Sequence, residues 1–376
     1  MKIAIVYEPW AHGEAHIEFN KAFLYVLSNI YDEIYFLGEK NHIKSLEQNT
    51  YNKPIKFTSI KITDYLTLKG KIAAITTEIK NIHKIKKLNK SSDIYFSYGA
   101  AHSMLISEKL LKKRKVLYVQ HGQIEYIDKK TSFLSLNHYI LPALKKLPEN
   151  HKIIVLADFI KNNLVKICPK IENKVICIDH PFIKSDKDIT FFEQEVETNE
   201  IKIGTIGVGT KEKGIELLNE IALNVSNQNE NIKFFHIGRV YNNVNIDYSV
   251  VNVPLRTESL IPRNEFLLEI SKLDFILFLY PKDSYRLTAS GAIFDAFMVG
   301  KPIIALENDY FSYLFKKAGN VGFLCNDKDQ LISTIKKLPI LTKEEYKNLI
   351  NNSKAALNSF SPKVVADELC KQIGDM

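Results

Sequence analysis

The chain has 376 residues, more than one hydrophobic core usually supports, so we expect two domains. Hydrophobic residues make up 45% of it and charged residues 25%, as in soluble globular proteins, and no apolar run is long enough for a membrane-spanning helix. The net charge of +8 is unevenly distributed. Residues 1–180 hold 28 Lys or Arg against 17 Asp or Glu, whereas the remaining residues hold 23 against 26. We therefore expect an anionic partner for the basic first half.

Short apolar runs alternate with amphipathic stretches through the first half. The start, MKIAIVYEPW, is too short for a signal peptide and reads as a buried strand, so we expect a cytoplasmic protein. Strands flanked by helices in this way predict a parallel sheet covered on both faces. The expected strands are Ile3–Tyr7, Glu33–Leu37, Ile94–Tyr98, Val116–Gln120, Ile153–Leu156 and Val175–Ile178, with helices at His16–Asn29, Ile72–Leu88 and Ser103–Lys112.

A polar loop follows the first expected strand and contains Glu8, Trp10, His12, Glu14 and His16. Glu14 or His12 is a candidate general base for an acceptor hydroxyl, although capping of the following helix explains the same residues. Metal binding by this loop is the less favoured interpretation. The four cysteines lack zinc-ligand spacing, and we expect neither a metal nor a cofactor.

A second series of strands and helices begins at residue 201 and predicts a second Rossmann-like domain. We expect doubly wound domains at 1–183 and 201–360, a polar linker at 184–200, and a last helix within 361–376 that packs back on the first domain. The expected strands are Ile201–Ile206, Lys233–Ile237, Ser249–Val253, Phe275–Leu279 and Pro302–Ala305, and the expected helices are Gly214–Asn224, Asn264–Ser271, Ala292–Val299 and Pro362–Ile373.

The loop over residues 279–291 is the most informative, because ligands bind at the carboxyl ends of parallel strands. A helix begins at Ser290-Gly291, where free backbone N–H groups and the helix dipole suit a diphosphate. Ser290 is a candidate to cap that helix or to bond a phosphate oxygen, and Asp295 lies within reach of a ribose hydroxyl. A plain helix cap with a solvated Asp295 accounts for the same pattern.

This segment resembles the nucleotide-sugar site of GT-B glycosyltransferases, particularly the large retaining family four. Tyr280-Pro281 ends a strand, and residues 295–304, DAFMVGKPII, resemble the family's Glu-Ala-Met-Ala-x-Gly-x-Pro-Val-Val. The glycines from Gly204 to Gly214 and the Ile-Gly ending at Gly238 fall in the family's order. The resemblance implies a GT-B fold, two Rossmann-like domains facing a central cleft, with a nucleotide-diphosphate sugar bound in the C-terminal half.

The resemblance and the loop chemistry together give a set of donor-binding candidates. They are Gly209, Lys211, Lys213, Arg239, Pro254, Tyr285, Arg286, Ser290, Gly291 and Asp295. Three positions depart from the family: Leu287 stands where the first acid of Glu-x7-Glu belongs, Asp295 replaces the second Glu, and Val208 replaces an Arg. A retaining mechanism therefore does not follow from the resemblance.

His121 ends another first-half strand and is similar to the His that faces the transferred sugar in many GT-B enzymes, which implies a contact with the sugar. A structural role for a single His is the alternative. His180-Pro181 is expected to form a turn. The pairs Asp186/Asp188 and Asp327/Asp329 read as turn or cap residues and not as a metal motif.

The sequence thus predicts a metal-independent glycosyltransferase that moves a sugar from a nucleotide-diphosphate donor to a glycan or lipid-linked acceptor, in bacterial surface-polysaccharide synthesis. The lysine groups at 80–90 and 109–115 fit an anionic inner membrane face as well as solvated helix faces, and no nucleic-acid motif accompanies them. The alternatives are a nucleotide-sugar epimerase of the same fold and, because of Leu287, a non-catalytic partner subunit. An oxidoreductase is disfavoured because no Gly-x-Gly-x-x-Gly follows the first strand.

Overall fold

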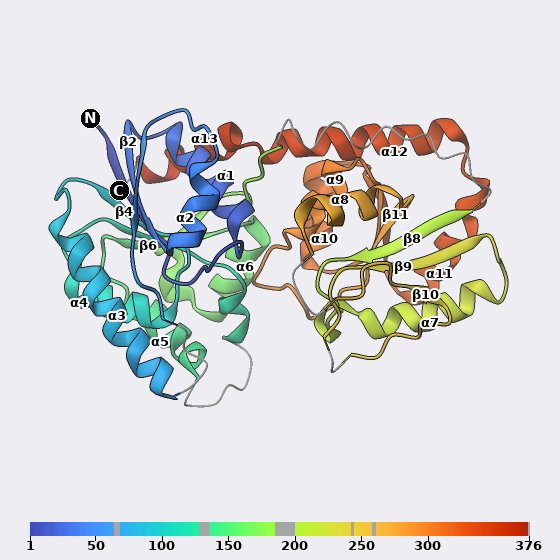
Figure 1. The fold of residues 1–376 in the computed structure, drawn as a ribbon, viewed down its shortest axis with the longest axis horizontal. Coiled ribbons are helices and arrows are strands. Elements are labelled where there is room, and N and C mark those ends of the chain that lie inside the picture. The colour runs from blue at the N-terminus through green and yellow to red at the C-terminus, as the bar shows by residue number, and fades with distance from the viewer. Residues whose placement is uncertain (64–67, 128–134, 185–199, 242–243, 258–260, 375–376) are drawn as a thin grey trace. The chain divides into compact units, whose positions relative to one another are not determined.

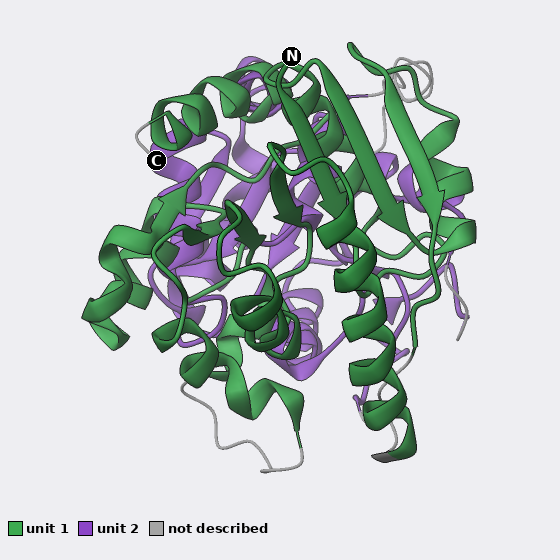
Figure 2. Ribbon diagram, turned by 90° about the vertical axis from the view of Figure 1, so that its left-hand side faces the viewer, with its two compact units in different colours: residues 1–183, 287–289, 360–376 green, residues 184–286, 290–359 purple. Residues whose placement is uncertain are grey.

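The structure is a computed structural model that describes residues 1–63, 68–127, 135–184, 200–241, 244–257 and 261–374 (Figure 1). These residues form two compact units (Figure 2). Unit 1 consists of Met1–Ile183, Leu287–Ala289 and Phe360–Met376, and unit 2 consists of Lys184–Arg286 and Ser290–Ser359. Most of the expected linker, including Asp186 and Asp188, lies outside the described residues.

Unit 1 is built on a parallel sheet of seven strands in the order β3-β2-β1-β4-β5-β6-β7. The chain moves outward from β1 to β3 and then returns to β4 on the other side of β1, which is the doubly wound pattern. All five residues of β1 are buried, because helices cover both faces of the sheet. The strands are β1 (Ile3–Tyr7), β2 (Glu33–Gly38), β3 (Ile55–Ser59), β4 (Asp93–Phe96), β5 (Val116–Val119), β6 (His151–Val155) and β7 (Val175–Cys177).

The helices of unit 1 pack against this sheet and against one another. In α1 the buried residues include Phe19, Phe23 and Val26, three or four positions apart, as expected for an amphipathic helix. The last helix, α13, packs against α1 and β7. The helices are α1 (Ile17–Ser28), α2 (Lys40–Glu47), α3 (Leu68–Lys87), α4 (Ala101–Leu110), α5 (Ile140–Lys145), α6 (Asp158–Ile167) and α13 (Pro362–Ile373), with 3-10 turns at Gly122–Tyr126, Leu136–Tyr139 and Pro169–Lys174.

Unit 2 repeats the plan with six parallel strands in the order β10-β9-β8-β11-β12-β13. Its switch point lies between β8 and β11. Its strands are β8 (Ile201–Ile206), β9 (Ile232–Ile237), β10 (Val251–Asn252), β11 (Phe275–Phe278), β12 (Ile303–Leu306) and β13 (Gly322–Cys325). Its helices are α7 (Ile215–Ser226), α8 (Arg263–Ser271), α9 (Ala292–Met298), α10 (Asp309–Ala318), α11 (Lys328–Lys337) and α12 (Lys343–Ala356), with 3-10 turns at Lys211–Lys213, Leu338–Ile340 and Leu357–Phe360.

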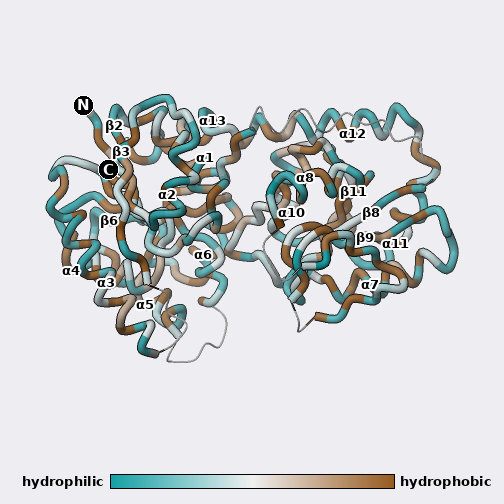
Figure 3. Tube along the Cα trace, viewed as in Figure 1, coloured by the Kyte–Doolittle hydropathy of each residue, from teal (hydrophilic) through white to brown (hydrophobic). Residues whose placement is uncertain are grey.

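The expected fold class, two doubly wound parallel sheets, is confirmed. Figure 3 shows strands such as β6 and β11 as largely hydrophobic segments, while the longer helices alternate between hydrophobic and hydrophilic. The carboxylate of Asp327 accepts a hydrogen bond from the backbone N–H of Gln330 at 2.8 Å, so this residue caps α11 as its sequence position indicated. No helix among the described residues is both long enough and apolar enough to cross a membrane.

Candidate functional site

Two glycines bring the carboxyl ends of three strands of unit 2 together. Gly238 follows β9 with φ +146°, and a Cβ there would lie 1.8 Å from the carbonyl oxygen of Gly207, which follows β8. Gly214 precedes α7 with φ +72°, and a Cβ there would lie 2.0 Å from the carbonyl oxygen of Leu279, which follows β11. Only glycine permits these approaches. The ends of β8, β9 and β11 therefore meet the start of α7 at one edge of the sheet.

The two lysines expected to neutralise phosphate have different surroundings. The ammonium nitrogen of Lys213 lies 3.2 Å from the position that a Cβ on Gly207 would occupy, directly beside the end of β8. Burial lowers the pKa of Lys213, and the carboxylate of Asp295 opposes this shift. Lys211 is exposed and pairs with Glu216 at 3.2 Å. Of the two, Lys213 is therefore the cation that faces the strand ends.

The start of α9 has an open backbone and a buried serine. No described protein atom lies within 4 Å of the position that a Cβ on Gly291 would take, so space remains in front of this backbone. Ser290 makes no side-chain cap and is 4% exposed. Its hydroxyl lies 3.0 Å from the Tyr280 hydroxyl, and its carbonyl accepts a hydrogen bond from Tyr310 at 2.8 Å. Gly291 occupies the N-cap position of α9, so Ser290 does not cap this helix, and the alternative of a bond to a phosphate oxygen stays a prediction.

Asp295 is paired within unit 2. Its carboxylate lies 2.6 Å from the guanidinium of Arg263, the first residue of α8, and its side chain is 14% exposed. The alternative of a solvated Asp295 is therefore wrong, and the ribose contact stays a prediction. Sequence reasoning missed Arg263, because the fold and not a local motif places it beside α9.

The remaining donor-binding candidates lie in loops after the strands of unit 2. Tyr285 has a left-handed backbone with φ 56°, and its ring stacks on Tyr280 at 4.3 Å between centroids. The carbonyl of Arg239 accepts from the N–H of Gly209 at 2.7 Å, and its guanidinium lies 4.7 Å from the ring centre of Tyr241. Pro254 is exposed after β10, and Arg286 follows Tyr285. Leu287, counted with unit 1, is 2% exposed.

In unit 1 a buried carboxylate organises the loop after β1. Glu8 is fully buried and accepts hydrogen bonds from the backbone N–H groups of Trp10 (2.9 Å) and Ala11 (3.0 Å). It also accepts from the Asn20 amide (2.9 Å) and the Ser97 hydroxyl (2.8 Å). From the sequence, Glu8 was only one residue of a polar loop. Its hydrogen-bonded environment was not predictable, because two of the donors come from α1 and the end of β4.

Aromatic and histidine rings gather next to this carboxylate. The ring of His121 stacks on Tyr98 (5.9 Å between centroids) and lies 4.8 Å from His16 and 4.5 Å from Phe19. Its Nε2 donates to the carbonyl of Ser97 at 2.9 Å. Burial and the neighbouring His16 hold the pKa of His121 well below its usual range, so the ring is neutral at neutral pH.

His16 and His180 join the same cluster. His16 precedes α1 with φ 56°, its ring lies 4.8 Å from Trp10, and its Nδ1 is buried with no hydrogen-bond partner among the described residues. His180, expected in a turn, lies edge-on to Phe19 at 5.2 Å, and burial lowers its pKa to about 4. The side chains of His12 and Glu14 are exposed, so the structure gathers His16 and His121 but leaves the two candidate bases on the surface of the loop.

The described residues contain no group of three His, Cys, Asp or Glu side chains arranged to hold a metal.

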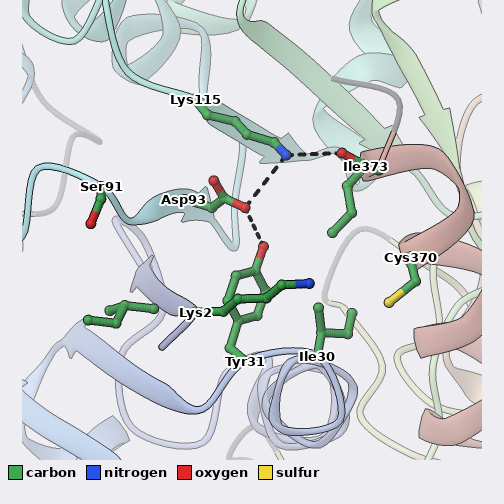
Figure 4. Close-up of a pocket in the computed structure, with 10 residues that line it drawn as sticks. Lys2, Ile30, Tyr31, Ser91, Asp93, Lys115, Cys370 and Ile373 are labelled. Atoms are coloured by element: carbon green, nitrogen blue, oxygen red, sulfur yellow. Dashed lines mark hydrogen bonds and ion pairs between the residues drawn. The ribbon is translucent and has the colours of Figure 1, made fainter.

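A separate pocket of about 280 Å³ lies at the opposite, amino edge of the unit 1 sheet (Figure 4). There Asp93 accepts from the Tyr31 hydroxyl at 2.6 Å and lies 3.6 Å from the Lys115 ammonium, which donates to the carbonyl of Ile373 at 3.1 Å. These polar groups bind one another and hold the end of α13 on the sheet.

Two doubly wound parallel sheets are the plan of the GT-B fold, and solved structures share it over nearly the whole chain. They include HepE of Anabaena in complex with UDP and glucose, at 13% identity and a TM-score of 0.64 over 99% of this chain and 100% of that one. Sucrose-phosphate synthase from Thermosynechococcus elongatus matches at 11% and 0.67, over 100% and 99%. WaaG, a glycosyltransferase involved in lipopolysaccharide biosynthesis, matches at 11% and 0.61, over 98% of each chain.

No protein-family model and no curated protein sequence matches the chain. At such low identities the structural likeness establishes the fold, and the expected GT-B architecture is confirmed. The binding and catalytic roles of individual residues stay predictions.

Proposed function

We propose that the protein transfers a sugar from a nucleotide-diphosphate donor to a hydroxyl of a glycan or lipid-linked acceptor. The observation that carries this proposal is the carboxyl edge of the unit 2 sheet, where the half-buried Lys213 places its ammonium beside Gly207. A cation in such surroundings is disfavoured by its loss of water, and an anionic ligand would offset that loss. A diphosphate supplies the charge, and backbone N–H groups such as that of Gly291 supply further donors.

The proposed reaction is a displacement at the anomeric carbon of the sugar. The acceptor oxygen bonds to that carbon, the bond from the carbon to the diphosphate oxygen breaks, and the diphosphate leaves with the electron pair. Lys213 and the backbone donors stabilise its developing charge without a metal ion. The acceptor proton passes to a base, for which Glu14 and His12 remain the candidates. Neutral His121 is suited to hydrogen bonds with sugar hydroxyls.

The solved structures with this fold support the choice of donor class. HepE is described in complex with UDP and glucose, and WaaG as involved in lipopolysaccharide biosynthesis. For this chain we propose a nucleotide-sugar donor and a place in bacterial surface-polysaccharide synthesis. The enzyme would work in the cytoplasm at the inner membrane face, because the net charge of +11 over residues 1–180 favours contact with anionic lipid.

The first test is nucleotide binding by a matched pair of lysine variants. UDP, GDP, CDP and ADP are titrated calorimetrically into the wild-type protein and into K213A and K211A. We expect one nucleotide to bind and K213A to weaken its affinity about 10- to 100-fold, because a hydrogen bond to a charged group is lost. K211A should change the affinity less than about twofold, because its exposed ammonium is paired with Glu216.

If no nucleotide binds, or if both variants lose affinity equally, the proposed donor site is wrong. Release of nucleoside diphosphate is then measured in the presence and absence of acceptors, which distinguishes sugar transfer from epimerisation. Acceptor-dependent release supports transfer, whereas turnover of the donor without an acceptor supports an epimerase.

One observation favours a second candidate function, a non-catalytic subunit that retains the fold. Leu287 stands where the resemblance places an acid, and it is 2% exposed, so the position is built for packing. This candidate predicts nucleotide binding without release of diphosphate from any donor. L287E is a poor rescue test, because it would bury a charge, and turnover by the wild-type protein is the deciding measurement.

A further inference from the structure

The longest helix of unit 1, α3, divides its side chains into two opposite stripes. Toward the core it buries residues three or four positions apart: Ala74, Glu78, Asn81, Ile82 and Ile85. On the opposite side a second stripe at helical spacing is exposed, and we call this set the α3 face. The α3 face consists of Lys69, Ile72, Thr76, Ile79, Lys80, His83, Lys84, Lys86 and Lys87.

The α3 face is strongly cationic. It carries five lysines, and the only acidic residue of α3, Glu78, is buried on the other side of the helix. The neighbouring helix α4, which packs against α3, is followed by further positive charge at the exposed Lys112 and Lys113. No described ion pair involves a lysine of the α3 face. Exposed positive charge on α3 and just after α4 is therefore not neutralised by acidic residues of α3.

Two isoleucines interrupt this positive charge. Ile72 is 60% exposed and Ile79 is 37% exposed, and they lie seven residues, or two helical turns, apart on one line along the helix. Lys69, Lys80 and Lys87 lie around them at helical spacing. Ile72 and Ile79 add exposed apolar area to the centre of a cationic face, and an interfacial helix combines apolar anchors with surrounding lysines in this way.

We infer that the α3 face binds an anionic lipid surface, with its lysines at the lipid phosphates and Ile72 and Ile79 in the outer part of the acyl layer. Nucleic acid fits less well, because the face contains no arginine and no Phe, Tyr or Trp to stack on bases. The inference deepens the proposed function, since a lipid-linked acceptor is presented at such a surface. The biological role of this lipid binding rests on the proposed function. The binding itself does not, because it requires no nucleotide-sugar donor.

The test is co-sedimentation of the full chain with vesicles of phosphatidylcholine, alone or mixed with phosphatidylglycerol. We expect binding to the mixed vesicles only, weakened by salt. The variant K80Q/K84Q/K87Q should lower the partition coefficient about 100-fold, at about fivefold per lysine. I72S/I79S should also weaken binding, and the part that persists at high salt should be lost, because apolar burial is not screened.

A matched control removes the same charge from unit 2. K337Q/K343Q/K347Q changes exposed lysines of α11 and α12 and should leave vesicle binding within about twofold of wild type. Equal loss in both triple variants, no binding to anionic vesicles, or unchanged binding by I72S/I79S would overturn the inference, as would tighter binding of duplex RNA than of vesicles. Nucleotide titration of the same variants separates this inference from the donor site, because the α3 variants should bind nucleotide normally.

Discussion

Glu78 is a carboxyl group inside the core of unit 1. It is 4% exposed and accepts a hydrogen bond from the hydroxyl of Tyr7 on β1. Burial raises the pKa of Glu78 to about 7, and the nearby carboxylate of Glu8 adds to the shift. Near neutral pH this side chain is therefore balanced between its protonated and charged forms, which makes the stability of unit 1 depend on pH.

The sign of that dependence follows from the raised pKa. The folded state binds the proton of Glu78 more tightly than the unfolded state, so its favourable contribution is present below about pH 4.5 and is lost as pH rises to about 7. We expect E78Q to remove this slope, because the neutral amide still accepts from Tyr7, and to be more stable than wild type at pH 8 by about 3 kcal/mol. Urea unfolding at pH 5 and pH 8 measures the stability difference between E78Q and wild type at each pH, with the exposed E47Q as control; a difference that does not grow from pH 5 to pH 8 contradicts the assignment.

Individual residues also show how far sequence reasoning reaches. The spacing of residues 295–304 located Asp295 at the start of α9, because motif and helix are local. Its pairing with Arg263 was not predictable, because the sheet order brings α8 beside α9. Likewise, the loop after β1 was recognised as polar, but the Ser97 hydroxyl that fixes Glu8 comes from the end of another strand.

At the scale of elements, burial decides which strands the sequence reveals. β1 and β8 have the predicted bounds, and both lie in the interior of their sheets. β1 is a continuous apolar run, whereas β8, with the sequence IKIGTI, carries its isoleucines at its ends and at its third position. β3 and β13 were not predicted, although the other two edge strands, β7 and β10, were. β3, with the sequence IKFTS, contains no fully buried residue, so it lacks the apolar signal of a central strand. The helix at Pro362–Ile373 was predicted with its observed bounds, because its proline stands at the first turn.

Side chains of α13 cover the free edge of β7, the last strand of the unit 1 sheet. The amide oxygen of Gln372 accepts from the backbone N–H of Cys177 at 2.9 Å, and its amide nitrogen donates to the carbonyl of the same residue. Glu368 accepts from the N–H of Asp179 at 2.9 Å. These hydrogen bonds replace the hydrogen bonds that a further strand would make with β7. They therefore cover an edge that could otherwise pair with strands of other chains.

We expect Q372A to destabilise unit 1 by about 1–3 kcal/mol, because a backbone N–H and a carbonyl lose their partner. The variant should also aggregate faster during refolding, because the edge of β7 is uncovered. Chemical unfolding and light scattering measure the two effects. K371A, at the exposed neighbouring position, is the matched control and should leave both unchanged; equal behaviour of the two variants would argue against the edge-covering role.

At the scale of the whole molecule, sequence order and structural units differ. Unit 1 contains the first 183 residues but also Phe360–Met376, and the backbone N–H of Phe182 donates to the carbonyl of Phe360 at 2.9 Å. The polar segment 184–200 was the predicted boundary, and the two units divide between Ile183 and Lys184. The return of residues 287–289 to unit 1 was not predictable, because it depends on tertiary contacts that no composition shift marks.

Removing residues 360–376 should therefore destabilise unit 1, although most of that unit comes from the first 183 residues. We expect calorimetry of the truncated protein to show unit 1 unfolding at a lower temperature as a separate transition, because α1 and β7 lose their cover. The transition of unit 2 should still rise with the nucleotide that binds the wild-type protein. A single transition that shifts as a whole, or loss of the nucleotide effect, would contradict this division.

The position of α13 also matters while the protein is being made. The ribosome synthesises all of unit 2 before it synthesises α13, so the strand edge at Cys177 has no Gln372 to cover it until 195 further residues are translated. At about 5–20 residues per second this takes roughly 10–40 s. During that interval the nascent chain has an open β-edge at its leading end, so chaperone contact is most needed there, and unit 2 is free to fold before unit 1 is finished.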